Sequence, residues 1–288
     1  MSKKTALITG ASSGFGRLTA LAMLAEGHTV YATMRNVNTN NSEVVSELEG
    51  AGAVVLELDV TDNLSVKAAI EEVSKSETAL DVLVNNAGVA AAGISESFHI
   101  DQVQSMFDVN VFGLMRVSQA VLPLMRQQKD GLIINIGSIL GRVTFPFFGL
   151  YGASKYAVEA ITDSMSYELS QLGVDVVLIQ PSAYPTNMYA NAIIPELTDV
   201  VGEYGDIAQI PEAISSTIAS MFEGDDAPQP ADIANAVVAI VAQEKGQREK
   251  RTVVGAGFGA DAANAEIKPI QSGLIASLDL SLLEQVKV

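Results

Sequence analysis

The sequence has 288 residues, of which 48% are hydrophobic and 18% are charged, a balance that excludes a disordered polar chain. Its 17 basic and 34 acidic residues give a net charge of −17, which disfavours binding to nucleic acid or to an anionic membrane. Cysteine is absent and the histidines are His28 and His99, so we expect no disulfide and no metal site. No run of about 20 apolar residues is present, and we expect a cytoplasmic protein.

Short apolar runs alternate with longer helical patterns along the chain. Strands are predicted, in chain order, at Thr5–Thr9, Thr29–Thr33, Ala53–Leu58, Val82–Asn85, Leu132–Ile136, Val174–Ile179 and Thr252–Val254. Helices are predicted between them at Phe15–Ala25, Leu64–Ser74, Val103–Arg126, Ser154–Leu172 and Ala231–Ala242. Several strands are apolar on both faces, which is typical of a parallel sheet covered by helices on each side. The alternation predicts an α/β, doubly wound fold with right-handed crossovers.

No linker, repeat or low-complexity tract divides the chain, so we expect one domain over residues 1–288. The segment 184–230 contains five prolines and interrupts the alternation of strands and helices. It follows the carboxyl end of a predicted strand, where ligands bind in open α/β sheets. This position predicts a lid over the substrate, and residues 256–288 form a C-terminal extension.

A glycine-rich turn directly follows the first predicted strand. Its G-x-x-x-G-x-G spacing differs from the commonest dinucleotide motif, but glycines at these positions let the backbone approach a pyrophosphate. The helix that follows presents free N–H groups and the positive end of its dipole to such an anion. The alternative is a tight turn that binds no ligand. The residues expected to line this cofactor site are Gly10, Ser12, Ser13, Gly14, Phe15 and Gly16.

The end of the second predicted strand bears on the choice of cofactor. An NAD site often places a carboxylate there to hold the ribose 2′-hydroxyl, but this strand is followed by Arg35. A guanidinium can instead pair with a 2′-phosphate. We therefore expect NADP(H) in preference to NAD(H), the alternative being that Arg35 is a solvated charge.

Four polar residues are candidates for catalysis. Tyr151 and Lys155 are spaced i and i+4, so they share one face of a helix. An ammonium about 4 Å away, at an effective dielectric of about 20, stabilises a phenolate by about 4 kcal/mol and would lower the tyrosine pKa toward neutrality. Ser138 follows a strand end and is placed to hydrogen-bond a carbonyl oxygen, and an amide at Asn110 is placed to hold a water. Taken singly, Ser138 also fits a helix cap and Asn110 a solvated helix position.

Together these motifs resemble the short-chain dehydrogenase/reductase family. The resemblance rests on the glycine-rich turn, the Asn85-Asn86-Ala87-Gly88 run and the set Asn110, Ser138, Tyr151 and Lys155, and it is dense from about Lys4 to Thr186. It implies a Rossmann fold with a seven-stranded parallel sheet and hydride transfer between a nicotinamide and a carbonyl or alcohol. In this family Tyr151 would be the acid/base, Lys155 would hold the nicotinamide ribose, Ser138 would orient the substrate and Asn110 would position a relay water. The further cofactor contacts that the resemblance implies are Asp59, Val60, Asn86, Ala87, Gly88, Pro181 and Thr186.

The chain departs from the family pattern at two positions. Pro181 is followed by Ser182 where the family often has glycine, and Ser13 stands where NADP-preferring members often carry a basic residue. Aromatic residues between Ser138 and Tyr151 favour a hydrophobic ketone as substrate, although they also suit core packing. A β-ketoacyl reductase is an alternative enzyme, and a non-catalytic dinucleotide sensor is an alternative of another class. By resemblance, we expect a homodimer or homotetramer.

Overall fold

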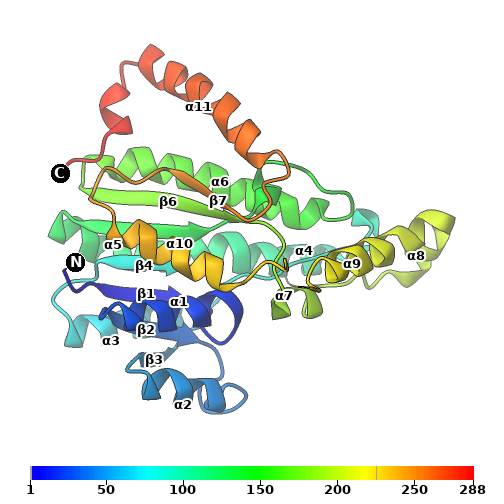
Figure 1. Ribbon diagram of the computed structural model, residues 1–288, viewed down its shortest axis with the longest axis horizontal. Coiled ribbons are helices and arrows are strands. Elements are labelled where there is room, and N and C mark those ends of the chain that lie inside the picture. The colour runs from blue at the N-terminus through cyan, green and yellow to red at the C-terminus, as the bar shows by residue number, and fades with distance from the viewer. Residues whose placement is uncertain (1, 225) are drawn as a thin grey trace.

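A seven-stranded parallel sheet forms the centre of the protein (Figure 1). The computed structural model describes residues 2–224 and 226–288. The strand order is β3-β2-β1-β4-β5-β6-β7, which confirms the predicted doubly wound α/β fold. The order reverses between β1 and β4, so a crevice opens at the carboxyl ends of these strands. The strands are β1 (Thr5–Thr9), β2 (Thr29–Met34), β3 (Val54–Glu57), β4 (Val82–Asn85), β5 (Gly131–Ile136), β6 (Val174–Pro181) and β7 (Arg251–Val254).

Helices cover both faces of the sheet (Figure 1). Those before the lid are α1 (Gly14–Ala25), α2 (Ser42–Gly50), α3 (Asn63–Ser76), α4 (Ile100–Phe107), α5 (Leu114–Gln128) and α6 (Gly149–Ser170). Those from the lid onward are α7 (Asn187–Ala190), α8 (Thr198–Glu203), α9 (Ile210–Ser220), α10 (Ala231–Ala242) and α11 (Ala260–Ser277). In the part of the chain that the structure describes, no helix is both long enough and apolar enough to span a bilayer.

Alternate residues of each strand enter two separate cores. In β1, Ala6 and Ile8 pack with α1 and α10 on one face, whereas Leu7 packs with α3, α5 and α6 on the other. All three side chains are fully buried. The sequence of β1 is apolar throughout because helices remove both of its faces from water.

The largest difference from the predicted elements concerns the helix expected at Val103–Arg126. The structure divides it into α4 and α5, which are joined by a π-helical turn at Asp108–Gly113. A π turn holds one more residue than an α turn, so it shifts the helix faces relative to each other and brings Asn110 into the interior. Hydrophobic periodicity did not predict α2, the lid helices or α11, because these are short or largely exposed.

The segment expected to act as a lid contains α7, α8 and α9. In Figure 1 these helices project from the end of the sheet to which the strands point. The segment is attached to the body by an isolated parallel bridge between Ala91 and Ile193 and by a hydrogen bond from the Gln102 side chain to the Ile194 carbonyl. The C-terminal extension contains α11, which lies at the opposite edge of the molecule from α2.

A buried ionic cluster connects α6 with four distant segments. The Glu159 carboxylate lies 2.9 Å from Arg142 Nη2 and 2.8 Å from Arg251 Nε, and it accepts a 2.5 Å hydrogen bond from Gln180 Nε2. Arg142 also donates to Asn264 of α11 at 3.0 Å. The cluster thereby ties the loop after β5, the helix α6, the end of β6, the strand β7 and the C-terminal extension together.

Candidate active site

The glycine-rich turn between β1 and α1 closes around two glycines that tolerate no side chain. A Cβ on Gly16 would lie 2.4 Å from both the Gly10 carbonyl oxygen and the Asn86 amide nitrogen, and Gly10 itself has φ +67°. The N–H groups of the first turn of α1 have no acceptor within the helix. The turn therefore presents backbone donors and a helix N-terminus to the crevice, as an anionic pyrophosphate requires. Ser12, Ser13 and Phe15 lie in the same turn.

The residues that follow β4 hold this turn through hydrogen bonds. Asn86 Nδ2 donates to the carbonyl oxygens of Thr9 at 2.8 Å and Gly10 at 3.1 Å. The backbone N–H groups of Asn86 and Ala87 both donate to Thr9 Oγ1, at 3.0 and 3.1 Å. Asn86 and Ala87 thus hold the phosphate turn in place, which is a structural role that the sequence alone did not reveal.

The residues expected at the adenosine end lie beyond β2 and β3. Asp59 accepts hydrogen bonds from the N–H and hydroxyl of Thr61, and the neighbouring Val60 is buried. The Arg35 side chain is 62% exposed, with Nη1 3.8 Å from Asp59 Oδ2. A salt bridge this open is weak, so the guanidinium is available to an incoming phosphate.

A carboxylate missed from the sequence also lies near this end. Glu57 of β3 accepts hydrogen bonds from the N–H groups of Asn36 and Val37, directly after Arg35. Its position follows from the pairing of Met34 with Glu57 between β2 and β3. Both oxygens of Glu57 are engaged by backbone, so it orders the loop that carries Arg35. The second basic residue near the turn, Arg17, is paired with Glu47 of α2.

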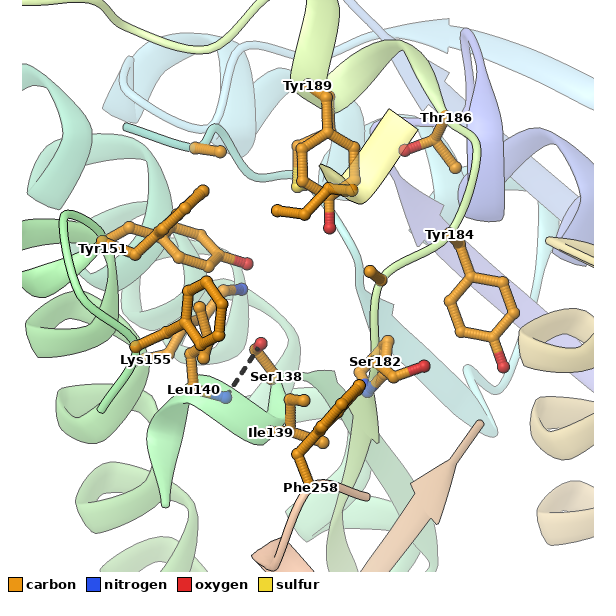
Figure 2. Close-up of a pocket in the computed structure, with 18 of the residues that line it drawn as sticks. Ser138, Ile139, Leu140, Tyr151, Lys155, Ser182, Tyr184, Thr186, Tyr189 and Phe258 are labelled. Carbon is orange, nitrogen blue, oxygen red and sulfur yellow. Dashed lines mark hydrogen bonds between the residues drawn. The ribbon is translucent and has the colours of Figure 1, made fainter. Parts of the chain in front are cut away.

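Three of the four catalytic candidates meet at one cavity of about 410 Å³ (Figure 2). Ser138 lies just past β5, and Tyr151 and Lys155 lie on successive turns of α6. All three side chains are buried, and all three line the cavity. Lys155 donates to the Ile136 carbonyl oxygen at 2.9 Å, while Ser138 Oγ accepts from the Leu140 N–H at 3.1 Å. Ser138 keeps its hydroxyl proton for a further acceptor.

The electrostatics of the Tyr151–Lys155 pair differ from the expectation drawn from spacing. Burial raises the pKa of Tyr151 above its usual value, the nearby Tyr189 adds to this, and the Ser138 hydroxyl acts in the opposite direction. Lys155 Nζ lies 5.7 Å from the centre of the Tyr151 ring, and burial lowers the pKa of Lys155 to about 8. The arrangement therefore holds Tyr151 as a neutral phenol. The ammonium keeps its charge below about pH 8 and loses it as the pH rises through that value.

Asn110 is buried beside this pair, but its side chain is already used. Its amide nitrogen donates to the Val89 carbonyl and the Ser154 hydroxyl, and its Oδ1 accepts from the Val89 N–H at 2.8 Å. A water can therefore bind this amide only as a donor to Oδ1. Gly88 leaves the space between Asn110 and Lys155 open, because a Cβ there would lie 3.3 Å from Oδ1 and 3.9 Å from Nζ.

The other wall of the cavity comes from the end of β6 and from the lid. Pro181 ends β6, and Thr186 lies beside the phosphate turn, with its methyl group 3.5 Å from where a Cβ of Gly14 would be. Sequence reasoning missed Tyr189 and Phe258, both of which line the cavity (Figure 2). No motif marks either residue, and their positions follow from the folding of the lid and the C-terminal extension.

The fold agrees with the comparisons to known proteins. The family model described as short chain dehydrogenase matches residues 4–195. A 3-ketodihydrosphingosine reductase of Bacteroides thetaiotaomicron is 38% identical over 206 residues, covering 72% of this chain and 73% of that protein. An NADPH-dependent 3-dehydrocapnine reductase of Ornithobacterium rhinotracheale is 35% identical over 216 residues, covering 73% and 76% respectively. This chain belongs to the short-chain dehydrogenase family.

Solved structures extend the similarity beyond the family model. A short-chain dehydrogenase from Streptomyces avermitilis superposes with a TM-score of 0.78 at 28% identity, covering 97% of this chain and 98% of the other. The actinorhodin polyketide ketoreductase, solved with NADPH, gives a TM-score of 0.74 at 26% identity over 89% of this chain and 97% of the other. The protein is thus an oxidoreductase of a family that uses a nicotinamide dinucleotide and acts on CH–OH or C=O groups.

Proposed function

We propose that the protein is an NADPH-dependent reductase of ketones that carry a long apolar substituent. The observation that carries this proposal is the cavity beside Ser138, Tyr151 and Lys155, because its wall is largely hydrophobic. Away from those three residues, the wall is made mainly of apolar side chains: Val143, Phe145, Phe148, Met188, Ile214, Ile218, Met221 and Phe258. Both curated relatives described above are named as reductases of keto or dehydro compounds, which supports the direction of reaction.

The pyrophosphate of the cofactor would lie on the turn at residues 10–16, and the nicotinamide riboside near Tyr151 and Lys155. A Cβ on Gly10 would clash with Ala87, and one on Gly16 would clash with Asn86 and with Gly10 itself, so these glycines let the turn fold tightly. The tight turn leaves the N–H groups at the start of α1 available to such a group. When bound, the nicotinamide dinucleotide supplies the hydride. Arg35 is the cationic residue that would pair with the 2′-phosphate of NADPH.

The chain's own residues supply orientation and a proton. Ser138 donates a hydrogen bond to the substrate carbonyl oxygen, which stabilises negative charge as it develops there. Tyr151 gives its phenolic proton to the same oxygen, a role that suits a phenol kept neutral by burial. Lys155 holds positive charge next to Tyr151. The space that Gly88 leaves open would admit a water between Lys155 and Asn110 Oδ1, through which a proton could return to Tyr151 after each turnover.

The proposal is tested by following the NADPH absorbance with a panel of ketones. Alkyl ketones with a chain of about eight carbons or more should be reduced with a higher kcat/KM than acetone-sized ketones, because each buried methylene adds about 0.8 kcal/mol of binding. A preference for the smallest ketones would contradict an apolar substrate. Tight NADPH binding with no turnover of any ketone would instead favour a non-catalytic dinucleotide sensor.

The cofactor preference is tested separately at Arg35. We expect the wild-type protein to use NADPH with a lower KM than NADH, and we expect Arg35→Ala to raise the KM for NADPH about 10- to 100-fold. This range corresponds to loss of a charged hydrogen bond of about 1.5–3 kcal/mol. The KM for NADH serves as the internal control and should change little. Equal use of both cofactors by the wild-type protein would contradict the assignment.

A further inference from the structure

The lid contributes a phenol to the cavity that the family mechanism does not use. Tyr189 lies on α7, and Figure 2 shows its hydroxyl directed into the cavity, across from the hydroxyl of Tyr151. The Tyr189 ring packs on Phe222, with ring centres 5.6 Å apart and an interplanar angle of 51°. This ring contact restrains the orientation of the Tyr189 side chain.

The Tyr189 hydroxyl has no hydrogen-bond partner within residues 2–224 and 226–288. Two other tyrosine hydroxyls are engaged: that of Tyr204 donates to Glu96 at 2.5 Å, and that of Tyr156 donates to the Arg142 carbonyl at 2.7 Å. Burial raises the pKa of Tyr189 to about 12, so the group stays protonated and acts as a donor throughout the physiological range. The Tyr189 side chain is half-buried, and a ligand in this apolar cavity that supplies an acceptor would form a hydrogen bond shielded from water.

The Tyr189 hydroxyl faces Tyr151, whereas the hydroxyl of Tyr184, which also has no partner in the described residues, points away from Tyr151 (Figure 2). Thr217, the polar residue that α9 contributes to the cavity, already donates to the Ala213 carbonyl at 2.9 Å. The α9 neighbours Ile214, Ile218 and Met221 are apolar. A substrate carbonyl held by Ser138 and Tyr151 would therefore have the Tyr189 hydroxyl as a further donor across the cavity. It would meet hydrocarbon over most of the remaining surface.

We propose that Tyr189 is a specificity-determining residue that donates a hydrogen bond to a second oxygen of the substrate, placed a few bonds from the ketone. The substrate class is then a β-oxygenated ketone, such as a 3-oxo ester, with a long alkyl chain on the other side of the carbonyl. The two phenols face each other across one cavity in Figure 2, so one substrate can contact both. This inference rests on the proposed ketone reductase function and adds the second recognition element to it.

The test compares two ketones of matched length with NADPH as reductant. Methyl 3-oxodecanoate carries the second oxygen, whereas dodecan-5-one replaces its ester group with hydrocarbon. We expect Tyr189→Phe to lower kcat/KM for the oxo ester about tenfold, since a polar group of the bound substrate is left unpaired, and to change kcat/KM for dodecan-5-one less than about twofold. The ratio of the two values isolates the hydrogen bond from any change in the shape of the lid.

The control variant is Tyr204→Phe, which removes a tyrosine hydroxyl of the same segment that bonds Glu96 instead of facing the cavity. It should leave kcat/KM for both ketones unchanged. An equal loss on both ketones in Tyr189→Phe, or no loss on either, would overturn the role of Tyr189 while leaving the reductase function intact. Failure of the wild-type protein to reduce either ketone would overturn the proposed function and this inference with it.

Discussion

Replacing Tyr151 with phenylalanine is expected to lower kcat about 10²- to 10⁴-fold, the range over which a positioned proton donor contributes to rate. The substitution removes the phenolic oxygen and keeps the ring, which is buried against Ala90, Met106 and Phe148. The fold and the hydrophobic wall should therefore be preserved. The measurement is single-substrate kinetics with NADPH in excess, together with NADPH affinity from quenching of protein fluorescence.

The affinity for NADPH should change little in this variant, because the turn at residues 10–16 and Arg35 are untouched. Tyr167→Phe provides the matched control, since it removes a hydroxyl from the far end of the same helix. That control should retain full turnover. Near wild-type turnover in Tyr151→Phe would show that another group protonates the substrate, and the assignment of Tyr151 would be wrong.

The second large effect is expected on stability, at Glu159. We expect Glu159→Ala to lower the free energy of unfolding by about 3–5 kcal/mol, because it removes one partner from a buried ion pair and leaves Arg142 and Arg251 without it. The Glu159 side chain is 3% exposed, so water cannot replace the lost contacts. Burial also raises the pKa of Glu159 in spite of both arginines. The effect therefore comes mainly from leaving Arg142 and Gln180 without a close partner, since Arg251 keeps Asp163 at 2.5 Å, and not from a large net gain when the pair forms.

Urea unfolding followed by circular dichroism measures this loss. Glu168→Ala is the matched control, because Glu168 lies on the same helix but is exposed and bonded by Ser164 alone. Its effect should stay within about 0.5 kcal/mol, as for most surface positions. A similar small change for Glu159→Ala would show that the cluster does not stabilise the fold. Because Arg142 follows the Ser138 turn, a folded Glu159 variant also shows whether the cluster affects turnover.

The fold could be read largely from the pattern of apolar residues. The run Val82–Asn85 was predicted to its residue, because a strand covered on both faces is apolar throughout and is bounded by polar turns. The helix Ala231–Ala242 was predicted equally well from its apolar stripe. The continuous helix predicted at Val103–Arg126 was wrong over Asp108–Gly113, where the structure has a π turn. A turn of six residues is too short to give a periodic signal of its own in the sequence.

The parts of the candidate site that depend on short intervals between residues could be predicted from the sequence. The i, i+4 interval of Tyr151 and Lys155 places both on one face of α6, and the glycine interval after β1 sets the turn by backbone geometry alone. The ionisation of Tyr151 was not predictable in this way. Spacing indicated an ammonium that lowers its pKa, but burial acts more strongly and depends on every segment that closes over the phenol.

The sequence by itself therefore determined the layered fold, the family and the candidate residues Ser138, Tyr151 and Lys155 that line the cavity, because each follows from spacing within the chain or from a repeating apolar pattern. Only the tertiary structure decided which walls complete the cavity and which charges meet in the interior. Tyr189 and Tyr151 lie on separate elements, and Glu159, Arg142 and Arg251 come from three others. Contacts of this kind depend on the packing of whole elements, for which no local interval in the sequence carries a signal.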